Sequence, residues 1–249
     1  MNSTGNTVFI PGSTSGIGLG MALRWAEAGN TVIVGGRRTD RLAEIAREHP
    51  ALHTVAVDVT DPDSITAAAT RVVAAHPELN VLVTMAGIMR PEDLRTPAFL
   101  PTAEALVETN VYGTIRLVAA LTPHLLTRPD ATIMTVSSAF GFVPWHVTPT
   151  YSGTKAFVHS YTQGLREQLR GTGVRVVELV PSGVRTDLMG QGANPAIPSV
   201  DEFLDQVFAL LGAHPSADEI VVDAVRFYRD AEREGRYADA YAFNVSITA

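Results

Sequence analysis

Short apolar runs alternate with longer helical patterns from Thr7 to Val180. Six of these runs have the length and composition of β-strands: Thr7–Ile10, Thr31–Val34, Leu52–Val57, Val81–Thr84, Ala131–Val136 and Val174–Val180. The stretches between them carry helical patterns, namely an Ala/Leu/Trp pattern that ends at Gly29, then Arg38–His49, Pro62–Ala75, Thr102–Leu121 and Tyr151–Arg170. Strands that alternate with helices in this way predict parallel βαβ units. Because the runs are apolar throughout, we expect helices on both faces of the sheet.

The pattern changes after Pro181. The segment Ser182–Val200 is rich in glycine, proline and asparagine, which predicts a long loop. Two helical stretches follow, near Val200–Leu211 and Ser216–Glu234, and a β-like run, Ala240–Val245, comes last. We therefore expect an α/β fold with a doubly wound, mostly parallel, Rossmann-like sheet of about seven strands in three layers. We find no internal repeat or linker, so residues 1–249 are predicted to form one domain.

Composition narrows the class of protein. The chain has 249 residues, of which 46% are hydrophobic and 18% charged, and this excludes a disordered protein. It has no cysteine, which excludes disulfides, thiolate metal sites and cysteine catalysis. The net charge of −7 offers nucleic acid no general attraction. The N-terminus lacks the features of a signal peptide, and no apolar run approaches the about 20 residues of a transmembrane helix. We therefore expect a soluble cytoplasmic protein that binds neither nucleic acid nor membranes.

A glycine-rich loop lies between the first predicted strand and the first predicted helix. It reads Gly12-Ser-Thr-Ser-Gly16-Ile-Gly18. Glycines at such a junction allow a tight turn and a close approach to a pyrophosphate, and the helix N-terminus that follows offers free N–H groups. The spacing is neither GxGxxG nor that of a Walker loop, so an ordinary βα turn is the alternative. The strand–loop–helix context favours a dinucleotide site.

Tyr151 and Lys155 are four residues apart in a predicted helix and therefore share one face. A neighbouring ammonium group stabilises a phenolate and lowers the pKa of a tyrosine, which lets it exchange a proton near neutral pH. Ser138 ends the fifth predicted strand, at the sheet edge where α/β proteins bind ligands. Asn110 is an amide inside a helical pattern, where amides have poor propensity. Taken singly, a solvated helix face explains the Tyr–Lys pair, and a backbone or water contact explains Asn110.

In this order and spacing, these residues resemble the short-chain dehydrogenase/reductase family in its short, single-domain branch. The resemblance extends from Thr7 to Asp187 and rests on Gly12–Gly18, Asp58-Val59, Ala86-Gly87, Asn110-Val-Tyr-Gly113, Ser137-Ser138, Tyr151-Ser-Gly-Thr-Lys155 and Pro181-Ser-Gly-Val-Arg-Thr186. The C-terminal stretch from Asp218 to Asn244 loosely resembles DltE-type bacterial oxidoreductases.

The resemblance implies a role for each matching residue. Tyr151 would be the general acid/base, Lys155 would lower its pKa and hold the nicotinamide ribose, and Ser138 would orient the substrate oxygen. Asn110 would position a water that links Lys155 to solvent. Asp58 would reach the adenine, and Thr186 the nicotinamide amide. The full set of implied cofactor contacts is Gly12, Ser13, Ser15, Gly16, Ile17, Gly18, Arg37, Arg38, Asp58, Val59, Ala86, Gly87, Tyr151, Lys155, Pro181, Val184 and Thr186.

Two positions depart from the family pattern. Pro11 replaces the usual threonine before the first glycine, and Thr84-Met85 replaces two asparagines before Ala86. In the family, these two strand ends are hydrogen-bonded neighbours. Proline has no N–H group and methionine has no amide, so we expect an apolar contact in place of this hydrogen bond.

Several bulky side chains fall near the expected mouth of the site. The candidate substrate-pocket residues are Phe140, Trp145, His146 and Met189, with Met89 and Phe142 nearby. Core packing or an oligomer contact would explain any one of them, and His146 is equally a candidate surface histidine. The seven histidines lack HxH and HExxH spacing, so no metal site is predicted. The absence of a GxSxG motif leaves serine hydrolysis unsupported. The loop near residues 182–200 is expected to fold over the substrate.

The predicted function is that of an enzyme, an NAD(P)(H)-dependent oxidoreductase. It would interconvert a carbonyl and an alcohol of a small-molecule substrate by hydride transfer, with a tyrosine as acid/base. The alternative is a non-catalytic nicotinamide-dinucleotide-binding sensor or scaffold, because a fold never proves a function. Such a sensor has no need of Ser138, Tyr151 and Lys155 together. The resemblance also implies a homodimer or homotetramer built on the helices Thr102–Leu121 and Tyr151–Arg170.

The end of the second predicted strand indicates which nicotinamide is preferred. An acid about twenty residues past the glycine loop would bind the adenosine ribose of NAD(H) and repel a 2′-phosphate. The chain reads Val34-Gly35-Gly36-Arg37-Arg38 there. By resemblance, Gly36 holds the place of that acid, and Arg37 that of a phosphate-binding arginine. We expect NADP(H) to be preferred over NAD(H), with Arg38 or Ser13 in support. The alternative is that both arginines cap the next helix in solvent, with Asp40 neutralising one of them.

Overall fold

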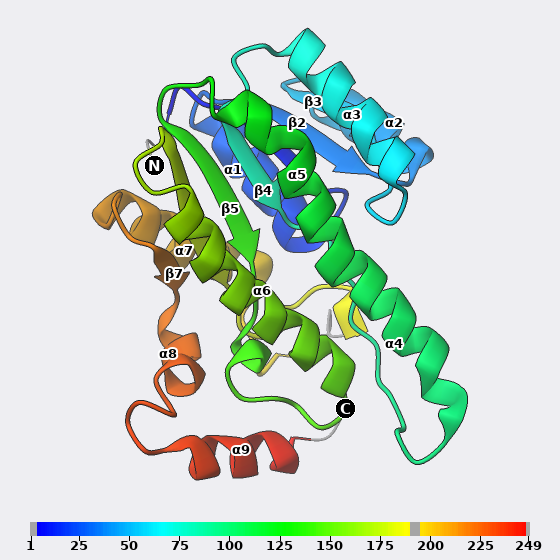
Figure 1. The fold of residues 1–249 in the computed structure, drawn as a ribbon, viewed down its shortest axis with the longest axis vertical. Coiled ribbons are helices and arrows are strands. Elements are labelled where there is room, and N and C mark those ends of the chain that lie inside the picture. The colour runs from blue at the N-terminus through cyan, green and yellow to red at the C-terminus, as the bar shows by residue number, and fades with distance from the viewer. Residues whose placement is uncertain (1–3, 190–194, 248–249) are drawn as a thin grey trace.

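A parallel sheet forms the centre of the structure. The computed structural model describes residues 4–189 and 195–247 (Figure 1). Seven strands lie in the order β3-β2-β1-β4-β5-β6-β7, and each neighbouring pair is parallel. The order reverses between β1 and β4, and open α/β sheets bind ligands at such a point, outside the carboxyl ends of the strands. The strands are β1 (Thr7–Pro11), β2 (Thr31–Gly36), β3 (Leu52–Ala56), β4 (Val81–Thr84), β5 (Ala131–Val136), β6 (Val174–Val180) and β7 (Glu219–Val221).

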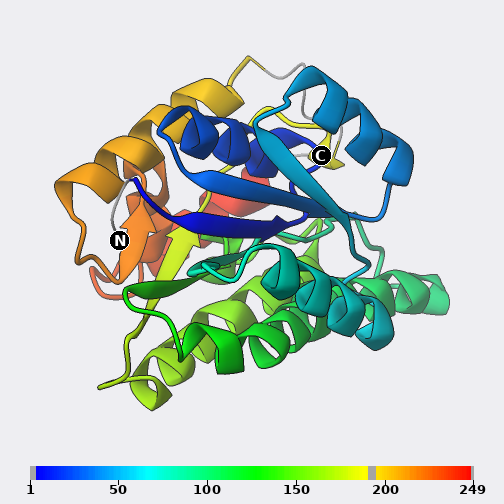
Figure 2. The same cartoon turned by 90° about the horizontal axis from the view of Figure 1, so that it is seen from above.

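Helices cover both faces of the sheet, as Figure 2 shows from above. The layer on one face contains α1, α2 and α7, and the layer on the other contains α3, α5 and α6. The predicted doubly wound, three-layer α/β class is thereby confirmed, whereas the extent of the domain stays a prediction. The α-helices of the described residues are α1 (Gly16–Glu27), α2 (Thr39–Glu48), α3 (Pro62–Ala75), α4 (Leu100–Val107), α5 (Gly113–Leu125), α6 (Pro149–Gln168), α7 (Val200–Ala213), α8 (Asp223–Arg229) and α9 (Tyr237–Ser246). None of the helices in this part of the chain is long and apolar enough to cross a membrane.

The strand β1 illustrates why these strands are apolar throughout. Its five residues are all buried. Successive side chains of a strand point to opposite faces. Val8 and Ile10 pack in the cluster that contains Trp25 of α1, whereas Phe9 packs in the cluster that contains Leu121 of α5. Each such side chain contributes about 1.5–3 kcal/mol when it is fully buried, so a polar residue on either face would weaken the core.

Local signals place α3 and three strands at their predicted bounds, 62–75, 81–84, 131–136 and 174–180. The start of α3 shows the reason. The Asp61 side chain accepts a hydrogen bond from the backbone N–H of Asp63, and Pro62 occupies the first helical turn. An acidic cap and a proline at this position are both favourable, because the first N–H groups of a helix lack partners within it.

The prediction for the C-terminal part is wrong in two places. Glu219–Val221 is the seventh strand, where one long helix over Ser216–Glu234 was expected, and it lies parallel to β6. The expected strand Ala240–Val245 is instead part of α9, which buries Ala240 and Asn244, four residues apart, on one side. A short apolar run does not by itself distinguish a strand from a helix. The free edge of β6 decides the matter, because it offers backbone partners to Glu219–Val221.

The expected helix Thr102–Leu121 is interrupted. Between α4 and α5 lies a π-helical turn, η2 (Glu108–Tyr112), in which the carbonyl of Glu108 accepts from the N–H of Gly113. A π-turn contains one extra residue and rotates the side chains that follow. Asn110 lies inside this turn, so the interruption falls at a predicted site residue.

Candidate active site

The glycine-rich loop connects β1 to α1 at the switch point of the sheet. Gly12 has a φ of +93°, and a Cβ there would lie 2.4 Å from the Cα of Ala86. A Cβ on Gly18 would lie 2.7 Å from the carbonyl oxygen of Gly12. The loop, the end of β4 and the first turn of α1 therefore touch through backbone alone. The N-cap Ser15 makes no side-chain capping bond and the first turn of α1 holds no acid, so its N–H groups can receive an anion.

A cavity of about 340 Å³ lies between this loop and the ends of β2, β3 and β4. It brings together predicted cofactor residues from four separate segments of the sequence. These are Gly12, Ser15, Arg37, Arg38, Asp58, Val59, Ala86 and Gly87. The lining also includes residues that the sequence analysis missed, namely Thr14, Gly36, Val57, Thr60, Met85, Ile88 and Thr109. Thr14 could have been predicted, because it lies between Ser13 and Ser15, which were both predicted cofactor contacts.

Both arginines at the end of β2 contact residues of this cavity. Nη1 of Arg37 lies 3.9 Å from Oδ2 of Asp58, and the Arg37 side chain is 63% exposed. Nη2 of Arg38 donates a 2.9 Å hydrogen bond to Oγ1 of Thr14. Asp58 is itself held by Thr60, whose N–H and hydroxyl donate to Oδ1 at 3.0 and 2.8 Å. The result is a fixed carboxylate near Arg37, with Arg38 held on the glycine-rich loop.

Other predicted cofactor residues lie around the cavity without lining it. The Ser13 hydroxyl donates to the carbonyl of Ile10 at 2.5 Å, which ties it into the turn. A Cβ on Gly16 would lie 3.2 Å from Cγ2 of Thr186, so Thr186 packs beside the start of α1. Ile17 and Gly18 are in the first turn of α1. The carbonyl of Pro181 accepts from the N–H of Ala139, and Val184 is buried in the core. Residues 190–194 of the predicted substrate loop lie outside the described residues.

The four predicted catalytic residues are all buried, at 1–7% exposure. Tyr151 and Lys155 lie one turn apart in α6, and the Lys155 ammonium is 5.7 Å from the centre of the tyrosine ring. This ammonium donates a 2.8 Å hydrogen bond to the carbonyl of Val136 at the end of β5. Ser138 follows two residues later in extended conformation and is hydrogen-bonded to the Tyr151 side chain. The end of β5 and the first turns of α6 thus place a phenol, a hydroxyl and an ammonium group together.

Burial dominates the proton affinities of this group. It raises the pKa of Tyr151 to about 12, although the hydrogen bond with Ser138 lowers that pKa. It lowers the pKa of Lys155 to about 8, and the negative charge of Glu178 raises that pKa. The sequence analysis expected the ammonium group to lower the tyrosine pKa, whereas in this structure desolvation raises that pKa and the opposing effect comes from Ser138. Tyr151 is therefore a neutral phenol at pH 7, the form that can donate a proton.

Lys155 is the only lysine of the chain, which otherwise carries its positive charges on arginine. Arginine does not lose its proton in proteins, whereas a buried lysine changes its charge readily. The choice of lysine at this buried position thus points to a group whose proton affinity matters.

Asn110 links three elements of the site. Its side-chain amide donates to the carbonyl of Ile88 at 2.9 Å and to Oγ1 of Thr154 at 3.1 Å. Its Oδ1 accepts from the N–H of Ile88 at 2.9 Å. Thr154 in turn donates to the carbonyl of Tyr151 at 2.7 Å. In this structure Asn110 therefore holds the chain after β4 against α6, while a role in a proton relay stays a prediction.

An apolar cluster adjoins Tyr151. Buried Met89, Leu106 and Trp145 pack with it, and the predicted Phe140 and Met189 lie against them. The rings of Phe140 and Trp145 are stacked, with centroids 5.4 Å apart. His146 is exposed, and Phe142 packs elsewhere, beside His159. The structure thus gathers three of the four candidate pocket residues around Tyr151.

The C-terminal segment contributes to this cluster, which the sequence analysis missed. The indole N–H of Trp145 donates to the carbonyl of Ile247 at 3.1 Å. The Asn244 side chain donates to the carbonyls of Val143 and Pro144 at 2.9 and 3.2 Å. Figure 1 shows α9, in red, beside the segment that leads into α6. A local sequence motif cannot predict contacts between residues that are about a hundred positions apart in the sequence.

The two departures from the family pattern lie at the end of β1 and just after β4. Pro11 pairs with Gly35 of β2, and the register between β1 and β4 stops at Phe9 and Leu82. Met85 packs against the core, as an apolar substitute would. The buried Thr84 hydroxyl has no hydrogen-bond partner among the described residues. The apolar contact expected between these two positions stays a prediction.

Comparisons with known proteins agree with this fold and site. A family model described as short chain dehydrogenase matches residues 6–195. The chain therefore belongs to the short chain dehydrogenase family, whose members are oxidoreductases that use a nicotinamide dinucleotide. The resemblance drawn from the sequence motifs is confirmed.

Individual relatives are similar to this chain in sequence or in fold. The uncharacterized oxidoreductase DltE of Bacillus subtilis strain 168 is 38% identical over 241 residues, which is 94% of each chain. A short chain dehydrogenase from Burkholderia cenocepacia J2315, solved with NADP, has a TM-score of 0.85 at 24% identity and covers 99% of this chain and 100% of its own. A 3-ketoacyl-(acyl-carrier-protein) reductase from Brucella melitensis, solved with NADH, has a TM-score of 0.75 at 26% identity and covers 84% and 91%. The DltE-type resemblance of the C-terminal part is thus also supported over nearly the whole chain.

Proposed function

We propose that this protein interconverts a carbonyl and an alcohol on a small molecule by hydride transfer, with Tyr151 as the acid/base. The observation that carries the proposal is the buried group of Ser138, Tyr151 and Lys155 beside the glycine-loop cavity. The cavity suits a dinucleotide, since its backbone cradle tolerates no Cβ at Gly12 and the N–H groups of α1 face it without an acidic competitor.

Each side chain has a defined task in this mechanism. A bound nicotinamide supplies the hydride in reduction and accepts it in oxidation. In reduction, the neutral phenol of Tyr151 donates its proton to the carbonyl oxygen of the substrate, while Ser138 orients that oxygen. Lys155 uses one ammonium proton on the carbonyl of Val136. An ammonium group has three donors, so two remain for the phenolate that forms and for ribose hydroxyls.

The proposal is tested by a panel of ketones, aldehydes, sugars, steroids and acyl thioesters. Each compound is mixed with the protein and NADPH or NADH, and the nicotinamide absorbance is followed. We expect turnover of at least one carbonyl compound, with a preference for substrates that carry an apolar group, because Trp145 and Met89 line the tyrosine side of the site. Tight dinucleotide binding without turnover of any compound would favour the sensor or scaffold alternative.

We further propose that NADP(H) is preferred over NAD(H). Arg37 is exposed at the cavity mouth and Arg38 is held over the loop by Thr14. A 2′-phosphate would therefore meet two guanidinium groups and no acid at the end of β2. The Arg37–Asp58 distance of 3.9 Å is long for an ion pair, which leaves Arg37 free to turn toward a phosphate.

Replacing Arg37 with alanine is expected to weaken NADPH binding about tenfold or more, because a hydrogen bond to a charged group contributes about 1.5–3 kcal/mol. The affinity for NADH, which lacks the phosphate, should stay nearly constant. Fluorescence titration of both cofactors measures the difference. Arg95→Ala is the control, since Arg95 is an exposed arginine paired with Asp93 and does not line the cavity. An unchanged NADPH affinity in Arg37→Ala would refute the assignment.

The oligomer also belongs to this proposal. α4, the π-helical turn η2 and α6 expose apolar side chains that a partner subunit would cover, among them Leu100, Tyr112 and Phe157. We expect a homodimer or homotetramer, built on the helices that the family resemblance implies. Sedimentation velocity at micromolar concentration tests it, and a single monomeric species would contradict it.

A further inference from the structure

The strand β6 contains a buried carboxylate that the catalytic mechanism above does not use. Glu178 lies in the middle of this apolar strand, between β5 and β7, and is 0% exposed. A carboxylate in such a place destabilises the fold unless hydrogen bonds and opposite charges compensate its lost hydration. Its partners therefore indicate what it does.

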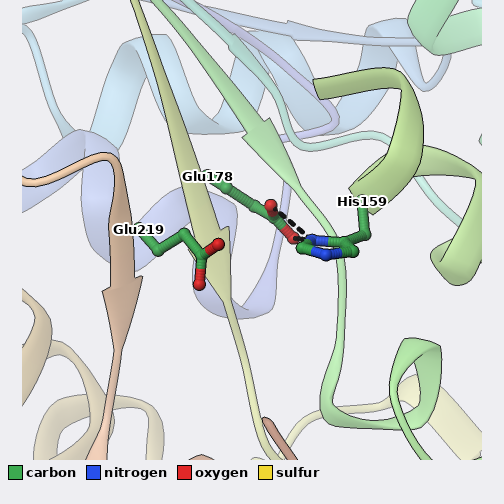
Figure 3. A group of neighbouring side chains, drawn as sticks. All are labelled: His159, Glu178 and Glu219. Atoms are coloured by element: carbon green, nitrogen blue, oxygen red, sulfur yellow. Dashed lines mark hydrogen bonds and ion pairs between the residues drawn. The ribbon is translucent and has the colours of Figure 1, made fainter. Parts of the chain in front are cut away.

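Glu178 is hydrogen-bonded to the two segments that carry the catalytic groups. Figure 3 shows His159 of α6 pointing toward Glu178, with Glu219 of β7 beside them. Nδ1 of His159 lies 2.8 and 3.1 Å from the two carboxylate oxygens. The hydroxyl of Ser137, which follows β5, donates to Oε1 at 2.5 Å. A carboxylate can only accept, so the His159 proton is on Nδ1.

The same three side chains offer potential metal ligands. One atom each of His159, Glu178 and Glu219 lies within 4.8 Å of the others. However, the Arg229 guanidinium donates to both oxygens of Glu219, at 2.7 and 2.9 Å. Glu178 is likewise engaged by His159 and Ser137. The carboxylates of the cluster thus have hydrogen-bond donors from the protein itself, and we assign no cation to it.

The hydrogen-bond partners of Glu178 lie next to Val136 of β5 and close to Lys155 in α6. Ser137 lies between Val136, whose carbonyl accepts from the Lys155 ammonium, and the predicted catalytic Ser138. His159 lies one turn beyond Lys155 on α6 and therefore faces the same side. Glu178 is thus hydrogen-bonded to Ser137, the residue after the one whose carbonyl binds the Lys155 ammonium, and to His159, one turn beyond Lys155 on α6. Lys155 is the only lysine of the chain.

We propose that Glu178 is a positioning residue of the active site, whose buried negative charge keeps the Lys155 ammonium protonated. The catalytic role of Lys155 rests on the proposed function. The effect of the Glu178 charge on the protonation of Lys155 does not depend on it. The pKa of Lys155 agrees with it, since burial lowers that pKa and Glu178 opposes the decrease. The charged and titratable groups around Glu178 are Lys155 and His159 of α6, Glu219 of β7 and Arg229 of α8, and Arg166 of α6 acts on Glu219. The Ser137 hydroxyl comes from the residue that follows β5.

The single lysine makes the proposal directly measurable. Protein made with lysine labelled by ¹³C at Cε gives one lysine signal, and its shift with pH reports the Lys155 midpoint without any substrate or turnover. In Glu178→Gln, which keeps the shape and removes the charge, we expect the midpoint to fall by about one pH unit. Glu178→Asp keeps the charge and should retain a midpoint close to that of the wild type.

The matched control is Glu219→Gln, the same change in the neighbouring carboxylate. Arg229 neutralises Glu219, and Glu178 is the one acid whose charge acts on Lys155 among the described residues. The midpoint should therefore move little. An unmoved midpoint in Glu178→Gln, or an equal decrease in Glu219→Gln, would overturn the proposal. If Glu178→Gln does not fold, Glu178→Ala is read by the same signal and the same criteria.

Activity supplies a second, separate measurement. In a pH profile of kcat/KM, the loss of activity at high pH should begin at lower pH in Glu178→Gln by the same amount, and Glu178→Asp should restore it. A purely structural role would lower the rate at every pH without moving the profile. If the lysine signal shifts as expected but Tyr151→Phe remains fully active, the proposed function fails while the assignment of Glu178 stands. An unshifted signal with an inactive Tyr151→Phe gives the reverse conclusion.

Discussion

Replacing Tyr151 with phenylalanine is expected to lower the rate of carbonyl reduction by about 10²–10⁴-fold, the usual contribution of a general acid. Phenylalanine retains the ring that packs against Leu106 and Trp145 and removes only the hydroxyl. The effect should appear in kcat, because the proton is transferred in the transition state and not on binding.

Tyr161→Phe is the matched control for this prediction. Tyr161 lies on the same helix, is half-buried and stacks on Phe157, outside the catalytic group. Its substitution should leave kcat unchanged. Binding of NADPH by Tyr151→Phe, measured by fluorescence, should be close to that of the wild type and so exclude unfolding as the cause. A Tyr151→Phe variant with wild-type kcat would rule out the tyrosine mechanism.

Replacing Lys155 with methionine is expected to abolish activity and, at the same time, to stabilise the cofactor-free protein by about 2 kcal/mol at pH 7. Burial lowers the pKa of Lys155 from 10.5 to about 8. At about 1.4 kcal/mol for each pKa unit, its ionisation opposes folding by about 3 kcal/mol. The lost hydrogen bond to Val136 offsets about 1 kcal/mol of that gain. Methionine fills a similar volume without a charge.

The sign of the pH dependence follows from the lowered pKa. The folded protein binds the lysine proton less tightly than the unfolded chain, so the penalty is complete below about pH 8 and fades as the pH rises toward 10.5. The stability difference between Lys155→Met and the wild type should therefore shrink over that range. Urea unfolding of both proteins at pH 7 and at higher pH measures it. A variant that is less stable than the wild type at pH 7 would contradict the prediction.

The sequence predicts the central layers and the cofactor loop well because both are local. The bounds of β4, β5 and β6 follow from apolar runs that end at polar or turn residues, and α3 begins at a recognisable cap. Gly12 and Gly18 are required by contacts closer than any Cβ allows, and such contacts leave glycines at fixed spacing. The order of the motifs identified the family for the same reason.

The predictions that failed, and the contacts that were missed, depend on partners far away in the sequence. Glu219–Val221 is a strand because β6 offers it a free edge, and Ala240–Val245 is helical because Asn244 is anchored to the segment before α6. The pKa values of Tyr151 and Lys155 follow from burial, which no spacing reports.

The sequence by itself thus determined the fold class and the family, and it named the candidate catalytic side chains, because turns, strands and short motifs are encoded by neighbouring residues. Only the tertiary structure decided how those side chains are charged and what surrounds them. It placed the C-terminal Ile247 against Trp145 and a buried Glu178 near Lys155. Desolvation and Coulomb interactions act through space, and the distances that set them arise only when the chain has folded.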